Sequence, residues 1–331
     1  MEYFSSYDAK TLISELISGG TSNYENLYSM LFSSVISGVK ELLPSFVVVC
    51  AISVLCGALN AVKNSFLADS TTDIIFFACY ASAVLVLFFR LYSVFSLCGE
   101  CMDELKKQME IVFPLLLTLM AASGGTVSVS IYHPAVVFLC DGIASVLTKI
   151  VLPFTLIILI LQMVSHLNGN IKLDGFVSLF KSANKWVIGV SVTVFGIFLS
   201  VQGIASASYD GISLRAAKYA ISNSVPIVGN FISGGFDLVL AGNALIKNSV
   251  GIIGVFLILA AVAKPMIALA SFSLLLRLTS AVCEPIGDQR ISQFLTKTAD
   301  TLGYLTAALL SLVFLYFLTV LLLICSAGII L

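Results

Sequence analysis

Long apolar stretches separated by short charged connectors set the pattern of this chain. The clearest apolar stretches are Leu42–Val62, Ile74–Leu97, Ile150–Leu167, Trp186–Tyr209 and Thr301–Leu331. A helix of about 20 apolar residues crosses the hydrocarbon core of a bilayer. The pattern therefore predicts an all-α fold, a polytopic membrane helical bundle with about six to eight transmembrane segments.

The stretch Ile111–Cys140 carries no formal charge, yet its pattern does not favour one continuous helix. Pro114 and Pro134 each remove a backbone donor, and Gly124-Gly125 lies midway between them. Interrupted backbone persists in a membrane only where protein buries it or where it lines a wet cavity. We interpret the stretch as a broken or re-entrant helix pair. The alternative is a single span with a small-residue packing face.

A second stretch, Tyr219–Ile246, has the same succession of residue types. Pro226 is followed by Gly234-Gly235 and then by Asp237. Paired interrupted segments in corresponding positions are typical of internal repeats that flank a transport path. We therefore predict a second broken helix and an internal repeat. Re-entrant broken elements predict parallel copies, and fully crossing ones predict inverted copies.

The repeat divides the chain into four regions. Residues 1–41 are predicted to form N-terminal amphipathic or interfacial helices, with neither a basic region nor a cleavage site typical of a signal peptide. Residues 42–96 hold the first two transmembrane helices. Residues 97–209 and 210–331 are the two predicted membrane repeats.

Small and polar residues recur at helical spacing in two of the predicted spans. In lipid, helices associate by close packing, and small residues permit it. We therefore expect two helix-packing faces and a tight bundle. The first face consists of Cys50, Ser53, Gly57 and Asn60, and the second of Gly189, Thr193, Gly196, Ser200 and Gly203.

Composition and charge support the membrane class. Of the residues, 59% are hydrophobic and 11% are charged, whereas a soluble domain has about 25% charged residues. The chain therefore cannot cover itself with a solvated surface, and its first partner is the lipid bilayer. A net charge of −1 argues against nucleic acid as a partner.

The sequence shows no catalytic constellation, so we expect no enzymatic activity, no cofactor and no metal site. Cys98 and Cys101 form a C-x-x-C pattern, but no strand and helix typical of a redox domain surround it. The chain has two histidines, His133 and His166, and neither has a cysteine or serine partner at a readable spacing.

Ionisable residues at membrane depth are the best functional candidates, because burying a charge there is costly without a partner. Asp237 lies in the second interrupted stretch, Lys264 lies in a long apolar run, and His133 lies in the first interrupted stretch. With the prolines and glycine pairs of both stretches they form a candidate conduit. The structural alternative is an ion pair, a snorkelling side chain or a hydrogen bond to broken backbone.

Several segments resemble the stage III sporulation protein AE family. They are Ala122–Ser128, His133-Pro134, Ser200–Gly203, Asp210–Lys218, Pro226–Gly229 and Lys247–Gly254. The similarity covers residues from about 42 to 331 in one register. It implies a multi-pass protein of the mother-cell-derived membrane that surrounds the forespore in endospore-forming bacteria.

The resemblance also implies a role and partners. The expected role is a membrane core component of a secretion or feeding channel between mother cell and forespore, needed for late forespore gene expression. The expected partners are other proteins of that assembly, including a secretion-type ATPase and ring-forming components. The alternative is a permease-like transporter of a small solute or ion, with its site at the broken helices.

Overall fold

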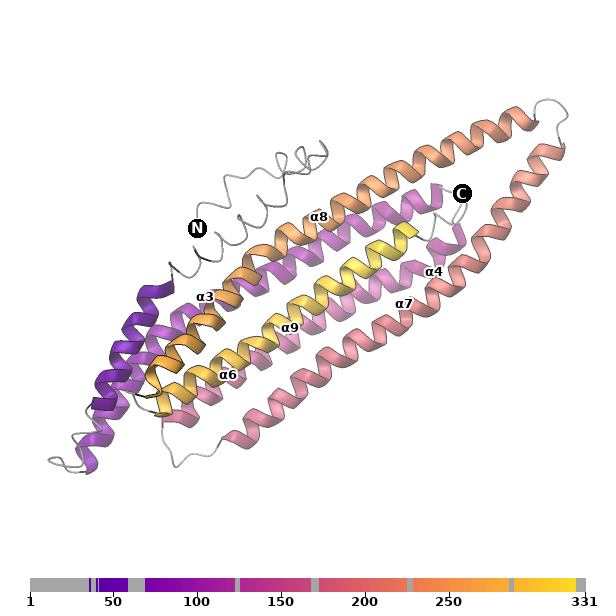
Figure 1. The fold of residues 1–331 in the computed structure, drawn as a ribbon. Helices are drawn as coiled ribbons and strands as arrows, with labels where there is room; N and C mark the ends of the chain where they lie inside the picture. The colour runs from indigo at the N-terminus through magenta and orange to yellow at the C-terminus, as the bar shows by residue number, and fades with distance from the viewer. Residues whose placement is uncertain are drawn as a thin grey trace.

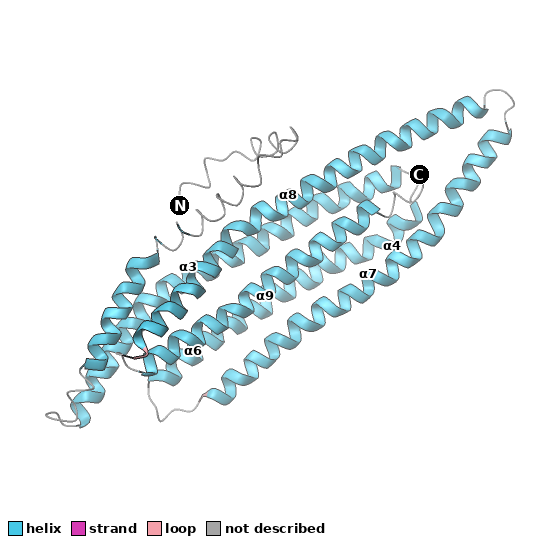
Figure 2. Ribbon diagram, in the orientation of Figure 1, coloured by secondary structure: helices cyan, strands magenta, loops and turns pink. Residues whose placement is uncertain are grey.

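The computed structural model describes residues 36, 40, 42–58, 69–122, 126–167, 173–224, 229–285 and 289–325. Every element in these ranges is helical, as Figure 2 shows. The predicted all-α class is therefore confirmed.

Long helices lie side by side in an elongated bundle (Figure 1). They are α3 (Asp69–Ala122), α4 (Thr126–Val137), η1 (Phe138–Ile143), α5 (Ala144–Val146), η2 (Leu147–Val151), α6 (Leu152–Leu167), α7 (Asp174–Ser224), α8 (Gly229–Cys283) and α9 (Gln289–Cys325). The elements from α4 to α6 follow one another without a gap and form one rod, which we call the α4–α6 rod. A shorter apolar helix, Leu42–Ala58, precedes them.

The α4–α6 rod runs antiparallel to α3, because the chain reverses between Ala122 and Thr126. At one end of this pair the Tyr80 hydroxyl donates to the Met163 carbonyl at 2.8 Å. Tyr80 is 1% exposed, so this hydrogen bond satisfies its buried hydroxyl while the ring fills the core. The contact fixes the register between the two rods.

The remaining helices complete the bundle, and aromatic side chains occupy its interior. The rings of Phe113 on α3 and Tyr316 on α9 meet edge to face at 5.2 Å. Phe46 of the short helix packs in the same manner on Phe272 of α8, also at 5.2 Å. The most extensive packing joins α8 and α9.

Prolines inside these helices are accommodated locally. Pro265 cannot donate to the Ala261 carbonyl, and the Cys101 thiol of α3 lies 3.4 Å from that oxygen and supplies a donor. Pro153 in α6 follows directly on the π-helical turn η2. A widened turn is a common response to a backbone bond that proline removes.

The fold bears on both predicted broken helices. The first interrupted stretch is broken as predicted, because α3 ends at Ala122 and the next helix, α4, begins at Thr126 and runs antiparallel to it. The second is not broken at its glycine pair, since α8 is helical through Gly234 and Gly235. Glycine costs about 1 kcal/mol relative to alanine in a helix, and packing along a 55-residue helix outweighs that cost.

Five described helical runs are long and apolar enough to cross a membrane, in addition to the shorter apolar helix Leu42–Ala58. They are Phe77–Ala122, Ser128–His166, Asp174–Val201, Ser249–Cys283 and Gln289–Ile324. The predicted polytopic membrane architecture agrees with this result. The internal repeat and its boundaries stay a prediction.

One ion pair joins α8 to α9 at the bundle surface, and we expect it to add little stability. Arg277 Nη2 lies 2.8 Å from Asp300 Oδ1, with the two side chains 57% and 51% exposed. Arg277→Ala should therefore lower the free energy of unfolding by no more than about 1 kcal/mol. Thermal unfolding at low and at high salt measures this, and the difference from the parent should shrink as salt rises. A large, salt-independent loss would contradict the expectation.

Candidate functional site

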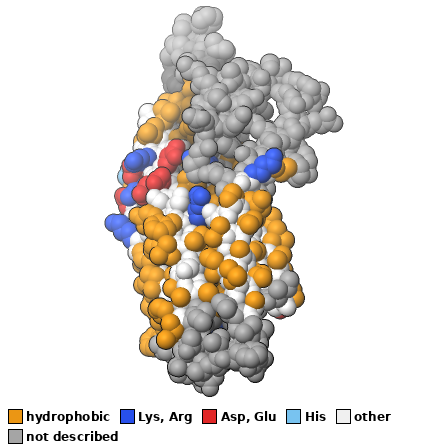
Figure 3. Space-filling view, turned by 90° about the vertical axis from the view of Figure 1, so that its left-hand side faces the viewer, with side chains coloured by type: hydrophobic (Ala, Val, Ile, Leu, Met, Phe, Trp, Pro, Cys, Tyr) orange, Lys and Arg blue, Asp and Glu red, His pale blue; other side chains and the backbone are white. Residues whose placement is uncertain are grey.

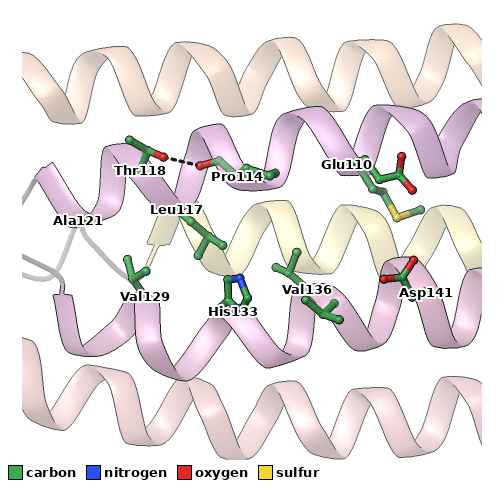
Figure 4. Close-up of a pocket in the computed structure, with 11 residues that line it drawn as sticks. Glu110, Pro114, Leu117, Thr118, Ala121, Val129, His133, Val136 and Asp141 are labelled. Carbon is green, nitrogen blue, oxygen red and sulfur yellow. Dashed lines mark hydrogen bonds between the residues drawn. The ribbon is translucent and has the colours of Figure 1, made fainter.

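A groove of about 610 Å³ runs between α3 and the α4–α6 rod, near the hairpin tip. In Figure 4, α3 contributes Glu110, Pro114 and Thr118 to one wall, while His133 and Asp141 come from the opposite wall. The Thr118 hydroxyl donates to the Pro114 carbonyl at 2.8 Å, so its hydrogen is used within its own helix. We call this feature the α3–α4 groove.

Two carboxylates that line one end of the α3–α4 groove share a lysine. Lys106 Nζ lies 3.4 Å from Asp141 Oδ1 and 3.9 Å from Glu110 Oε1. The Lys106 side chain is 30% exposed, against 53% for Glu110 and 69% for Asp141. One cation therefore serves two acids, and this end of the groove has an excess of negative charge.

Local geometry brings the three charges together. Lys106 and Glu110 are one turn apart on α3, which places them on the same helix face. Asp141 lies in the π-helical turn η1 of the opposing rod. Single π-helical turns within α-helices occur frequently at functional sites.

The height of this charge cluster in the bundle follows from contacts on either side of it. Cys101 contacts Ala261 of α8, and a Cβ on Gly254 would meet Val112 at 3.4 Å. Lys106 lies between Cys101 and Val112 on α3. It is therefore level with the α8 segment from Gly254 to Ala261.

At that height the outer surfaces of α7 and α8 are apolar. Phe138 of η1 stacks on Phe195 of α7 with ring centroids 6.5 Å apart, which puts the neighbouring turns of α7 level with η1. Val194 and Ile197 on α7 are 46% and 60% exposed, and Leu259 on α8 is 61% exposed. Figure 3 shows charged side chains gathered beside a broad hydrophobic surface. At this height the bundle thus has charged side chains on its α3–η1 side and exposed apolar side chains on α7 and α8.

The structure brings together part of the predicted conduit. Pro114 and His133 both line the α3–α4 groove, and Pro134 is exposed on the next position of α4. Lys264 is exposed on α8 and does not line the groove. Gly124, Gly125 and Pro226 lie outside the described residues, as do the side-chain surroundings of Asp237 and of the glycine pair in α8.

The two predicted packing faces have different surroundings. On the first, Ser53 is buried and Cys50 and Gly57 are half-buried, while Asn60 lies outside the described residues. On the second, the described members point outward: Gly189, Thr193 and Ser200 are exposed and Gly196 is half-buried, and the surroundings of Gly203 are not described.

The described members of the second face therefore do not pack on a neighbouring helix, and its role as a helix-packing face stays a prediction. A Cβ added at Gly189 or Gly196 would meet nothing within 4 Å. The helix α7 instead turns Asn184, Phe195 and Leu199 toward the interior, and these are at most 2% exposed. The spacing of the small residues showed that they share one face of α7. It did not show whether that face points to the interior or to the outside of the bundle.

Sequence reasoning did not single out Glu110 and Asp141, which lie in charged connectors beside the apolar stretch Ile111–Cys140. The available signal was the spacing of Lys106 and Glu110 on one helical face. The partner on the opposing rod depends on the antiparallel register of the hairpin, which the sequence did not fix.

The chemistry of the described cysteines and acids favours structural roles. Cys98 and Cys101 are buried and free, at 0% and 4% exposure, so bulk oxidants do not reach the C-x-x-C pattern. Within the described residues, no group of three or more His, Cys, Asp or Glu side chains is placed to hold a metal ion. The α3–α4 groove presents two carboxylates and an imidazole, which can interact with cations and polar groups.

Comparisons with known proteins assign a family. The family model for stage III sporulation protein AE matches residues 7–328. Stage III sporulation protein AE of Bacillus subtilis (strain 168) is 28% identical over 293 residues, which cover 88% of this chain and 72% of that relative. No solved structure matches. The match to the family model extends over nearly the whole helical bundle, and the chain belongs to the stage III sporulation protein AE family.

Proposed function

We propose that this chain is an integral membrane core component of a sporulation-specific secretion or feeding channel between mother cell and forespore. It acts in the mother-cell-derived membrane around the forespore and is needed for late forespore gene expression. Family membership supports the sporulation role, and five candidate membrane spans support the membrane location.

The charged α3–η1 side is the observation that carries the channel role. Lys106, Glu110 and Asp141 lie level with exposed apolar side chains of α7 and α8. If those apolar surfaces face lipid, the charged side is at bilayer depth, where ionisable groups face water or protein. An assembly in which this side lines an aqueous path accounts for both surfaces.

The length of the helices supports docking partners outside the bilayer. The helical run Phe77–Ala122 has 46 residues, which corresponds to roughly 69 Å at 1.5 Å per residue. The hydrocarbon core is about 30 Å thick, and tilting cannot absorb the whole excess. The excess length gives the ring-forming components and the secretion-type ATPase a surface to bind.

A permease-like function is the second candidate, and the α3–α4 groove favours it. Its volume of about 610 Å³ is in the range of small-molecule sites. Two carboxylates and one imidazole line it, which suits a small cationic solute. This candidate differs from the first because it requires transport by the protein alone.

Flux and ion conductance of the purified protein in liposomes separate the two functions. We expect no saturable flux from the chain alone, and loss of sporulation when Glu110→Gln and Asp141→Asn are combined in a strain that lacks its own copy. Asp174→Asn is the matched control, because this exposed acid pairs with Lys297 away from the groove. Saturable flux that the double substitution abolishes would replace the channel role with the permease. Normal sporulation in the double variant would contradict both.

A further inference from the structure

A stripe of polar side chains lies buried where α6, α7 and α9 meet. Thr155, Gln162, Asn184, Thr298 and Thr301 are each at most 1% exposed. We call this stripe the α6–α7–α9 seam. It is separate from the α3–α4 groove, which α3 and the opposite end of the α4–α6 rod form.

Contacts of α9 on both sides of Thr298 show that this residue faces α6. Phe294, one turn earlier on α9, packs on the His166 ring at 6.1 Å. Thr301, one turn later, lies 3.1 Å from Gln162 Oε1. Positions three and four residues apart share a helix face, so Thr298 lies in the seam next to Gln162.

Three polar groups in the seam lack a described hydrogen-bond partner: Gln162 Nε2, Asn184 Oδ1 and Thr298 Oγ1. Asn184 uses its Nδ2 to donate to the Thr155 hydroxyl at 2.9 Å, and that hydroxyl donates to the Val151 carbonyl, so the amide orientation is fixed. The Asn184 oxygen is then left without a donor.

Gln162 lacks one hydrogen-bond partner in either orientation of its side-chain amide. The Thr301 hydroxyl lies 2.8 Å from the Lys297 carbonyl as well as near Gln162, and it has a single hydrogen to donate. If that hydrogen goes to Lys297, Gln162 must turn its nitrogen toward Thr301 and leave its oxygen unpaired. One end of the Gln162 amide lacks a partner in either arrangement.

We propose that the α6–α7–α9 seam binds ordered water inside the membrane bundle. Water is the ligand that fits, because it both donates and accepts and so serves an amide nitrogen, an amide oxygen and a hydroxyl alike. One site lies at Gln162 and Thr298, and a second lies at Asn184. The two are separated by about two turns of α6, or roughly 10 Å. The seam is then a hydrated interior path along α6, and it does not depend on the proposed channel role.

Hydroxyl-radical footprinting of the protein in lipid nanodiscs tests the proposal directly, because radiolysis of bound water labels the side chains beside it. Leu159 lies on α6 between Thr155 and Gln162 and is 4% exposed, and Leu312 on α9 is fully buried among apolar side chains. We expect label on Leu159 and none on Leu312. Equal absence of label at both positions overturns the proposal.

An isosteric substitution gives an independent readout. Thr298→Val removes an unpartnered hydroxyl, which raises the melting temperature if the seam is dry and lowers it if water binds there. The control is Thr319→Val on the same helix, whose hydroxyl donates to the Leu315 carbonyl at 2.8 Å. We expect Thr298→Val, like the control, to melt below the parent protein, and we expect it to lose label at Leu159. A melting temperature above that of the parent protein overturns the proposal.

Discussion

Replacing Gly251 by leucine is expected to lower the free energy of unfolding by about 1–3 kcal/mol, the usual cost of overpacking a core. A Cβ at Gly251 would overlap Ile324 Cδ1 and lie 2.6 Å from its Cγ1. Ile324 can move its tip away from a single added carbon, but a leucine side chain needs the space that the whole isoleucine fills. The substitution therefore forces α8 away from α9, where packing is most extensive.

Gly189→Leu is the matched control for this prediction, because a Cβ there meets nothing within 4 Å. Both substitutions add the same side chain to a helix and remove the same conformational freedom of glycine. The difference between the two variants in denaturant or thermal unfolding therefore isolates the steric cost. Equal stability of the two variants would show that α8 and α9 do not approach closely at Gly251.

The hydrophobic pattern predicted the helices better than it predicted their interruptions. Prolines and glycine pairs carry a local cost, and the sequence shows that cost but not what offsets it. At Pro265 the offset is the Cys101 thiol, which comes from α3 and reaches the carbonyl that proline leaves unpaired. At the glycine pair of α8, packing along a long helix offsets the cost of the two glycines. Both compensations come from tertiary structure. The spacing of residues in the sequence therefore could not show that α8 stays helical at Gly234 and Gly235.

In the candidate site, too, the residues close together in the sequence were predicted, and the contacts between distant segments were not. Pro114 and His133 were identified from one interrupted stretch, and the hairpin does place them in one groove. Asp141 could be joined to Lys106 only through the register of two antiparallel rods, which Tyr80 and Met163 help to fix at the far end. A charged connector in the sequence thus becomes part of the groove wall in three dimensions.

Reversing the charge of Lys106 is expected to abolish function while costing little stability. Lys106→Glu would place a third carboxylate beside Glu110 and Asp141 in a cluster that now has one cation. Because these side chains are 30% to 69% exposed, water screens the repulsion, and the free energy of unfolding should fall by only about 1 kcal/mol. In the proposed channel, a wall with three acids and no cation in this cluster would change the ion selectivity. We expect sporulation to drop to the level of a strain without the gene.

Combining Lys106→Glu with Asp141→Lys keeps one cation and two acids in the cluster and is expected to restore sporulation. The swapped pair spans the same 3.4 Å contact between α3 and η1, and the new lysine again lies beside Glu110. Spore counts and unfolding curves of both single variants and the double variant measure the coupling. Rescue shows that the pairing across the groove is what function requires. If the double variant fails although it folds and inserts as the parent does, each charge acts through its own position, and the groove is not a balanced charged wall.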